Sequence, residues 1–218
     1  MSYPHSTCVT RKHIVMTVSS PRSFLILHGI EHHRPPEHWQ HWLAERLRAD
    51  GHHVRYPGLP DPDNPSLVEW TSALCENLAR WGGGERVVIC HSLACLLWFH
   101  ASVFVSPEER PHRLLLVSPP APERVPDAGA EFRLGALDVT SVRDSVIDDI
   151  RIVASGNDPY NPSGAAALYA TPLGVGLDVV EGAGHITPDD GYGPWPELAA
   201  WCHDPRQRLS GNSRPAAA

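Results

Sequence analysis

The sequence predicts an α/β protein with a parallel sheet of about six strands and helices on both faces. Short, fully apolar runs alternate with stretches of helical spacing, and polar or glycine-bearing loops follow several of these runs. Strands that are apolar throughout are typical of parallel sheets, because each right-handed crossover lays a helix on the sheet. The chain has 218 residues, 42% of them hydrophobic and 20% charged, which suits a single globular domain.

The first half of the chain is predicted to contain three strands and two helices. The strands cover residues 24–27, 54–56 and 87–90, and turn residues follow the first two. The first helix ends at Gly51, since glycine is favoured directly after a helix. Ser66 is expected to cap the second helix. Apolar residues recur at helical spacing in both, at positions Trp39, Trp42, Leu43, Leu47, Trp70, Leu74 and Leu78.

The second half continues the alternation with a break in the middle. Residues 93–105 predict a buried helix, residues 163–169 a short helix and residues 195–201 the last helix. Strands are expected over residues 114–117, 150–154 and 177–180. Residues 119–143 interrupt this rhythm and are rich in Pro, Gly, Asp and Glu. We expect a small lid-like insertion there, over the carboxyl edge of the sheet.

The domain boundaries follow from the same pattern. Residues 1–20 are expected to be a flexible extension without the apolar core of a signal peptide, and Met16 is a candidate start because the recognisable pattern begins after it. Residues 21–203 form the predicted folded domain. Residues 204–218 are polar and then Pro/Ala-rich, which predicts a disordered tail.

Charge and cysteine content exclude several classes of function. The net charge of −7 and the absence of a basic run argue against nucleic-acid binding. No run reaches the ~18 apolar residues of a membrane span. An odd number of irregularly spaced cysteines argues against a disulfide framework and favours a cytoplasmic location. The five are Cys8, Cys75, Cys90, Cys95 and Cys202.

The strongest local signal is the segment 87–95, where a buried strand runs directly into an apolar helix with Ser92 at the turn. This setting is typical of a nucleophile elbow, whose sharp turn exposes the serine hydroxyl above the sheet. The usual elbow has glycine two residues before and after the serine, and here Cys90 and Ala94 take those places. Both are small enough for the turn. The alternative is a serine that only caps a helix.

Two further polar residues follow predicted strands. Asp158 lies in the loop after strand 150–154, and His185 ends the glycine-bearing loop after strand 177–180. Alone, Asp-Pro is a common turn and a loop histidine is commonly solvated. Their conjunction with Ser92 changes the interpretation, because Ser, Asp, His is the chain order of α/β-hydrolase triads. We therefore predict Ser92 as nucleophile, His185 as general base and Asp158 as the orienting acid.

An oxyanion hole is predicted from the same architecture. The backbone N–H of Leu93 follows the nucleophile at the start of a helix and should point at the developing oxyanion. The loop after the first strand, His28-Gly29-Ile30, is expected to supply the second N–H from Ile30. The alternative for this loop is an ordinary turn.

Together these residues resemble the compact α/β-hydrolases of the RBBP9/YdeN type, over about residues 23–201. The resemblance rests on His28-Gly29, on the segments 38–42, 91–93 and 157–160, and on the segments 184–186 and 191–196. It implies the α/β-hydrolase fold, a triad of Ser92, Asp158 and His185, and a small lid. It also implies hydrolysis of esters or related acyl compounds, with amides or thioesters possible, without a cofactor. The elbow departs from that family's G-H-S-x-G at Cys90 and Ala94, which bears on turnover more than on fold.

Three rival interpretations remain at this point. The first is a metal site built from the early histidines, which no carboxylate or cysteine pattern accompanies; they are His28, His32, His33, His38 and His41. The second is a binding protein that kept the fold and lost turnover. The third is a cysteine hydrolase, which the buried positions expected for Cys90 and Cys95 disfavour. Trp39 and Trp98 are expected to lie in the core. The expected binding partner is a small acyl substrate. The sequence does not predict an oligomeric state.

Overall fold

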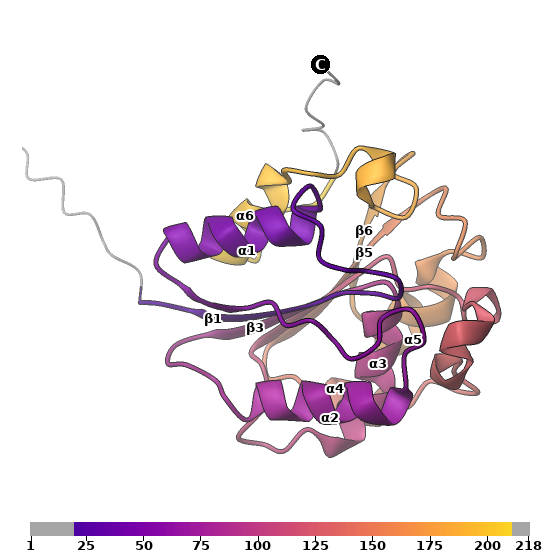
Figure 1. The fold of residues 1–218 in the computed structure, drawn as a ribbon, viewed down its shortest axis with the longest axis horizontal. Helices are drawn as coiled ribbons and strands as arrows, with labels where there is room; N and C mark the ends of the chain where they lie inside the picture. The colour runs from indigo at the N-terminus through magenta and orange to yellow at the C-terminus, as the bar shows by residue number, and fades with distance from the viewer. Residues whose placement is uncertain (1–19, 211–218) are drawn as a thin grey trace, which may run out of the picture.

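Six parallel strands form the centre of the molecule, in the order β2-β1-β3-β4-β5-β6 (Figure 1). A computed structural model describes residues 20–210 of the chain. All five strand pairings are parallel, as the apolar runs predicted. The strands are β1 Ser23–Leu27, β2 His53–Arg55, β3 Arg86–His91, β4 Arg113–Val117, β5 Asp149–Ser155 and β6 Gly176–Val180.

Helices cover both faces of the sheet, which confirms the predicted fold class. α1 Trp39–Ala49 and α6 Pro196–His203 lie side by side on one face (Figure 1). The other face carries α2 Leu67–Leu78, α3 Leu93–Ala101, α4 Val139–Asp144 and the short α5 Thr171–Leu173. Within residues 20–210, no helix is long and apolar enough to cross a membrane.

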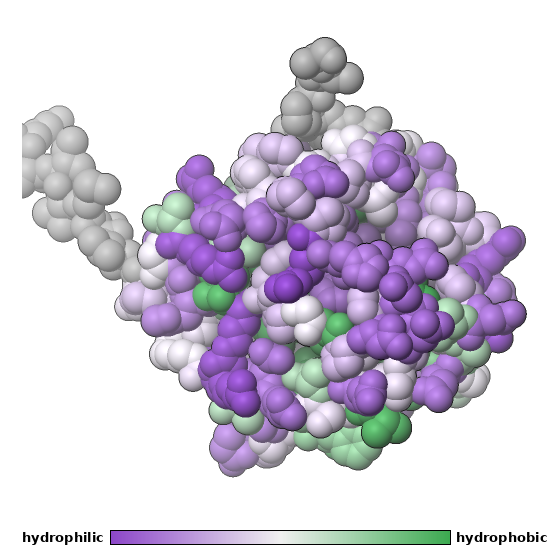
Figure 2. Space-filling view, viewed as in Figure 1, coloured by the Kyte–Doolittle hydropathy of each residue, from purple (hydrophilic) through white to green (hydrophobic). Residues whose placement is uncertain are grey.

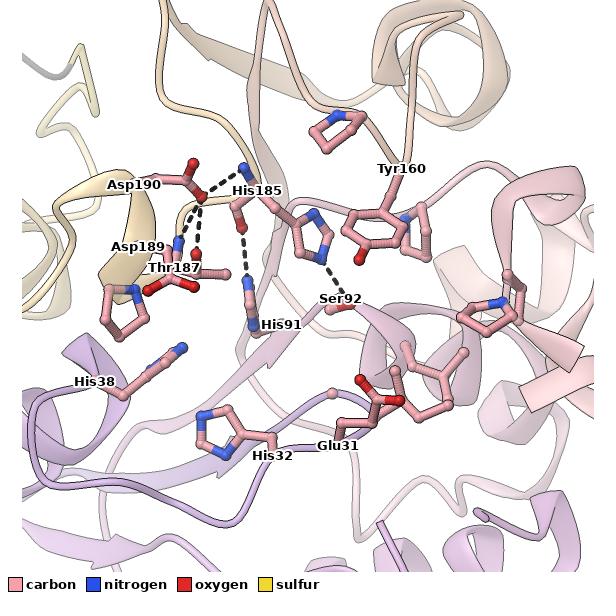
Figure 3. A pocket seen from close by; sticks show the side chains of 18 of the residues that line it. Glu31, His32, His38, His91, Ser92, Tyr160, His185, Thr187, Asp189 and Asp190 are labelled. Atoms are coloured by element: carbon pink, nitrogen blue, oxygen red, sulfur yellow. Dashed lines mark hydrogen bonds between the residues drawn. The ribbon is translucent and has the colours of Figure 1, made fainter. Parts of the chain in front are cut away.

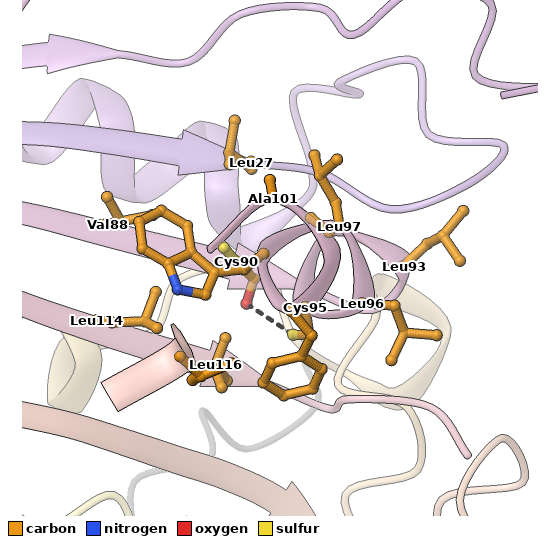
Figure 4. Close-up of a cluster of buried hydrophobic side chains, with 14 of the residues drawn as sticks. Leu27, Val88, Cys90, Leu93, Cys95, Leu96, Leu97, Ala101, Leu114 and Leu116 are labelled. Atoms are coloured by element: carbon orange, nitrogen blue, oxygen red, sulfur yellow. Dashed lines mark hydrogen bonds between the residues drawn. The ribbon is translucent and has the colours of Figure 1, made fainter. Parts of the chain in front are cut away.

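Alternate side chains of each strand enter two separate cores, because successive residues of a strand point to opposite faces. Val87 and Ile89 of β3 pack with Trp39 of α1 on one face. Val88 and Cys90 pack against α3 on the other, where Figure 4 shows them with side chains of β4. α3 is apolar on all sides, which suits a helix buried between the sheet and α2. The face of the molecular surface that Figure 2 shows is mostly hydrophilic, with small separate apolar areas.

Several predicted elements differ from the structure at their ends. The helix expected over residues 93–105 stops at Ala101 and continues as the 3-10 turn Ser102–Phe104. The helix expected over residues 163–169 is a π turn, Ala166–Ala170, that leads into α5. β2 ends at Arg55, so the predicted strand 54–56 is displaced by one residue. The last helix begins at Pro196 rather than Trp195 and extends to His203.

Residues 119–143 do break the alternation of strands and helices. They contain two 3-10 segments, Pro122–Arg124 and Asp127–Phe132, before α4 begins. Ser66 precedes α2 as predicted, yet its side chain makes no capping hydrogen bond. The Glu131 carboxylate accepts from the Leu67 amide instead, at 2.9 Å. The insertion therefore supplies the cap that Ser66 was expected to give.

Part of the predicted tail is packed. Leu209 is fully buried and its amide donates to the Asp178 carboxylate at 3.2 Å, while Arg208 pairs with the same carboxylate. The ordered chain therefore extends beyond the boundary expected at residue 203. The extension at residues 1–19 with Met16, and the last eight residues, lie outside the described part of the chain.

Candidate active site

The turn between β3 and α3 has the geometry of an elbow. Ser92 has φ 56° and ψ −125°, a strained conformation for a residue with a side chain. Its amide donates to the Val117 carbonyl at 2.9 Å, which ties the turn to β4. Cys90 and Ala94, in the places of the usual glycines, are fully buried. The turn therefore forms with these larger residues, and it lifts the Ser92 side chain above the carboxyl ends of the strands.

Gly29 lies directly against this turn. A Cβ atom placed on Gly29 would lie 2.7 Å from the Ser92 Cβ and 3.1 Å from its Oγ. Only a residue without a side chain lets the loop after β1 approach the elbow this closely. The pattern His28-Gly29-Ile30 was also compatible with an ordinary turn, and the close approach shows why a glycine stands there.

The structure brings Ser92, His185 and Asp158 together although 93 and 27 positions separate His185 from the other two. His185 Nε2 lies 2.8 Å from Ser92 Oγ (Figure 3). His185 Nδ1 lies 2.9 and 3.0 Å from the two Asp158 oxygens. A carboxylate can only accept, so Nδ1 carries the proton and Nε2 is free to accept from the serine hydroxyl. Asp158 is 3% exposed and His185 is 9% exposed.

Neighbouring groups fix the acid and the imidazole ring. The Tyr160 amide donates to Asp158 Oδ1 at 2.9 Å, which leaves the carboxylate little freedom to rotate. The Tyr160 ring packs on the His185 ring, with centroids 4.5 Å apart (Figure 3). Asn157 Oδ1 accepts from the Gly184 amide at 2.8 Å, so the acid loop also holds the histidine loop.

Asp190, which was not predicted as a site residue, holds the histidine loop from its other side. Its Oδ2 accepts from the His185 amide at 2.9 Å and from the Thr187 hydroxyl at 2.9 Å. Thr187 and Asp190 form a capping box around the 3-10 turn Pro188–Asp190. The spacing Thr-x-x-Asp with a proline at the second place is a signal in the sequence that could have identified this residue.

Both amides predicted for an oxyanion hole border the same pocket as Ser92. Ile30 and Leu93 line the pocket, and neither amide donates to an acceptor within residues 20–210. Leu93 is the first residue of α3, where the backbone N–H groups have no partner inside the helix. These amides are therefore available to a ligand, and the positive end of α3 lies at the serine.

The pocket around Ser92 encloses about 610 Å³ and has two kinds of wall. One wall is apolar and includes Ile30, Leu93 and residues of the insertion such as Val125. The other wall carries His32, His38, Thr187 and Asp189 (Figure 3). A pocket of this size accommodates a small organic molecule, with the serine hydroxyl between an apolar and a polar part.

His28, the first of the early histidines, is fixed by two hydrogen bonds. His28 Nε2 accepts from the Leu59 amide at 2.8 Å, so its Nδ1 donates to the Gly29 carbonyl. Burial lowers the pKa of His28 to about 4. Among residues 20–210, no group of three or more His, Cys, Asp or Glu side chains is arranged to hold a metal ion.

The two cysteines near the elbow do not reach the pocket. Cys90 and Cys95 are fully buried, and burial raises the pKa of each thiol above its ordinary value. A thiol in this state is a poor nucleophile, because the thiolate is the reactive form. Trp39 and Trp98 are also fully buried, which confirms their placement in the core.

The chain is similar to a known protein family and to a named relative. The family model described as serine hydrolase matches residues 24–203. YdeN of Bacillus subtilis is 26% identical over 170 residues, which cover 77% of this chain and 87% of YdeN.

Two solved structures share the fold. The crystal structure of the Bacillus subtilis YdeN gene product has a TM-score of 0.72 and 24% identity, over 84% of this chain and 97% of that one. A YdeN-like hydrolase of Pectobacterium atrosepticum has a TM-score of 0.63 and 22% identity, over 85% of this chain and 93% of that one. The family match confirms the resemblance inferred from the motifs: the chain belongs to the serine hydrolase family and has the α/β-hydrolase fold.

Proposed function

We propose that this protein hydrolyses esters of small acyl groups through a covalent acyl-enzyme on Ser92. The observation that carries the proposal is the continuous hydrogen-bond chain from Ser92 Oγ through His185 to Asp158, with distances of 2.8 and 2.9 Å. The strained elbow and the two free amides beside it support the same chemistry.

In the proposed reaction, His185 Nε2 takes the hydroxyl proton as Ser92 Oγ attacks the acyl carbon. The amides of Leu93 and Ile30 donate to the oxyanion of the tetrahedral intermediate. The protonated imidazole, stabilised by Asp158, then gives its proton to the leaving alcohol. A water molecule then attacks the acyl carbon while His185 takes one of its protons. The bond to Ser92 Oγ breaks, His185 returns the proton to that oxygen, and the acid leaves. The same steps serve an amide or a thioester.

The apolar wall supports a short acyl group as substrate. A Cβ atom on Gly129 would lie 3.2 Å from Val125 Cγ1, 3.3 Å from Leu93 Cδ2 and 3.5 Å from Ile30 Cδ1. The backbone of the insertion therefore closes in directly behind these three side chains. We place the acyl group on this wall and the alcohol on the wall of His185, which protonates it.

We further propose that residues 119–143 act as a small lid. Pro120, Arg124, Val125 and Pro126 of this segment line the pocket. The segment is tied to α2 through the bond between Glu131 and the Leu67 amide.

The unpaired cysteines of the described residues support a reducing compartment such as the cytoplasm. They are Cys75, Cys90, Cys95 and Cys202.

The test is hydrolysis of p-nitrophenyl acetate, butyrate and octanoate by the wild type and by Ser92→Ala. We expect turnover that is highest for the short esters and that falls by about four or more orders of magnitude in Ser92→Ala. Ser106→Ala is the matched control, since that serine bonds Glu109 away from the pocket. A folded wild type that binds these esters and hydrolyses none of them would instead favour the alternative, a binding protein that retains the fold.

A further inference from the structure

Both polar atoms of the His185 main chain are held by side chains. Its N–H donates to Asp190, as described above, and its carbonyl accepts from His91 Nε2 at 3.0 Å (Figure 3). The next carbonyl, that of Ile186, accepts from Trp39 Nε1 at 2.9 Å. The side chain and main chain of His185 are therefore fixed separately. The bonds to the carbonyls of His185 and Ile186 come from β3 and α1.

The loop needs such support because its backbone is strained. Gly184 and Ile186, on either side of the histidine, both have φ near 56°. This region is unfavourable for a β-branched residue such as isoleucine. A strained loop persists only where the surrounding structure determines it, so the bonds to its carbonyls decide where the imidazole lies.

Hydrogen-bond partners assign the proton positions of two rings below this loop. The His185 carbonyl can only accept, so His91 carries its proton on Nε2 and its Nδ1 is an acceptor. His38 Nδ1 accepts from the Gln40 amide at 3.1 Å, so its proton is on Nε2. His38 therefore has an N–H donor at Nε2 and His91 has an acceptor at Nδ1. The centroids of the two rings are 5.5 Å apart.

These two rings form a buried and uncharged support. His38 is 2% exposed and His91 is 3% exposed, and Figure 3 shows His91 between His38 and the His185 carbonyl. Burial lowers the pKa of His38 to about 3 and the pKa of His91 well below its ordinary value. Neither His38 Nε2 nor His91 Nδ1 has a hydrogen-bond partner among the described residues.

We propose that His91, the residue before the nucleophile, is a positioning residue that sets the place of the His185 imidazole by holding its main-chain carbonyl. The His38 ring packs beside the His91 ring, with centroids 5.5 Å apart. This inference rests on the proposed hydrolase function. His91 borders the pocket but is 3% exposed, and its ring bonds the His185 carbonyl, so its loss should slow the chemical step more than it weakens substrate binding.

The test compares His91→Leu with His91→Gln. Leucine fills the buried space without a donor, whereas glutamine can present an N–H close to the place of the imidazole Nε2. A misplacement of about 1 Å in a reacting group costs about 100-fold in rate. We therefore expect His91→Leu to lower kcat for p-nitrophenyl butyrate by about 10- to 100-fold with KM within about threefold. His91→Gln should recover at least about tenfold of that loss.

His52→Leu is the matched control. His52 is another buried histidine, but it precedes β2 at the amino ends of the strands and does not border the pocket. Its activity should stay within about twofold of the wild type. Thermal melting of each variant separates misfolding from mispositioning. If His91→Leu does not fold, His91→Asn replaces it, because asparagine carries its amide too far from the His185 carbonyl to bond it.

Two results would overturn the inference without touching the proposed function. The first is that the wild type is active and a folded His91→Leu variant has the same kcat. The asparagine variant is compared in the same way if it replaces the leucine variant. The other is a glutamine variant that is no more active than the variant without a donor. A wild type that neither hydrolyses the ester nor reacts with a fluorophosphonate would instead overturn the proposed function, on which this inference depends.

Discussion

Gly29→Ala is the substitution for which the structure gives the clearest steric consequence. The added methyl would lie 2.7 Å from the Ser92 Cβ and 3.4 Å from the His91 carbonyl oxygen. Ordinary van der Waals contact begins at 3.4 Å, so the loop and the elbow must separate by about 0.7 Å. Gly29 does not have a positive φ, so alanine adds no backbone strain and the effect is purely steric.

That separation would move the Ile30 amide away from the oxyanion and tilt the Ser92 hydroxyl. We expect kcat/KM for p-nitrophenyl butyrate to fall by about 10- to 100-fold, with a loss of about 1–3 kcal/mol in the free energy of unfolding from overpacking. Steady-state hydrolysis and urea unfolding measure the two effects. Gly83→Ala is the control, because a Cβ there meets nothing within 4 Å. Activity of Gly29→Ala within twofold of the wild type would refute this reasoning.

Three other perturbations have distinct expected outcomes. Asp158→Asn keeps the shape of the acid and removes its charge, so kcat should fall by about 10⁴-fold as in other triads; a loss below tenfold in stopped-flow hydrolysis would show that Asp158 does not orient His185. Val125→Ala deepens the apolar wall and should raise kcat/KM for the octanoate ester about tenfold relative to the acetate, whereas an unchanged ratio would place the acyl group elsewhere. The free energy of unfolding should decrease as the pH falls from about 6.5 toward about 4. Burial lowers the pKa of His28 to about 4 and of His38 to about 3, so the unfolded chain takes up protons that the folded one does not. A urea midpoint equal at pH 7.5 and pH 5 would contradict this.

The architecture could be predicted because its signals are local. Each strand is a short apolar run, and alternate residues of β3, such as Val87 and Val88, fill different cores as the parallel sheet requires. The end of α3 could not be predicted, because a fully buried helix has no polar boundary to mark it. The cap of α2 could not be predicted either, because Glu131 belongs to an insertion 64 residues away along the chain.

The residues of the candidate site also differ in whether local sequence patterns could predict them. Ser92, Asp158 and His185 each follow a strand, and parallel strands all present their carboxyl ends at one edge, so the local pattern was enough to bring them together. The support around them was not predictable in this way. His91 and the His185 carbonyl are 94 positions apart, and the fit of Gly29 against the elbow depends on the approach of two separate loops.

The proposed chemistry requires that Ser92 is a nucleophile activated by its neighbours. Reaction with a fluorophosphonate, followed by mass spectrometry of the digested protein, measures this without knowledge of the natural substrate. We expect a single adduct on the peptide that contains Ser92, absent in Ser92→Ala and formed far more slowly in His185→Ala. An adduct on another residue, or none on a folded wild type, would contradict it.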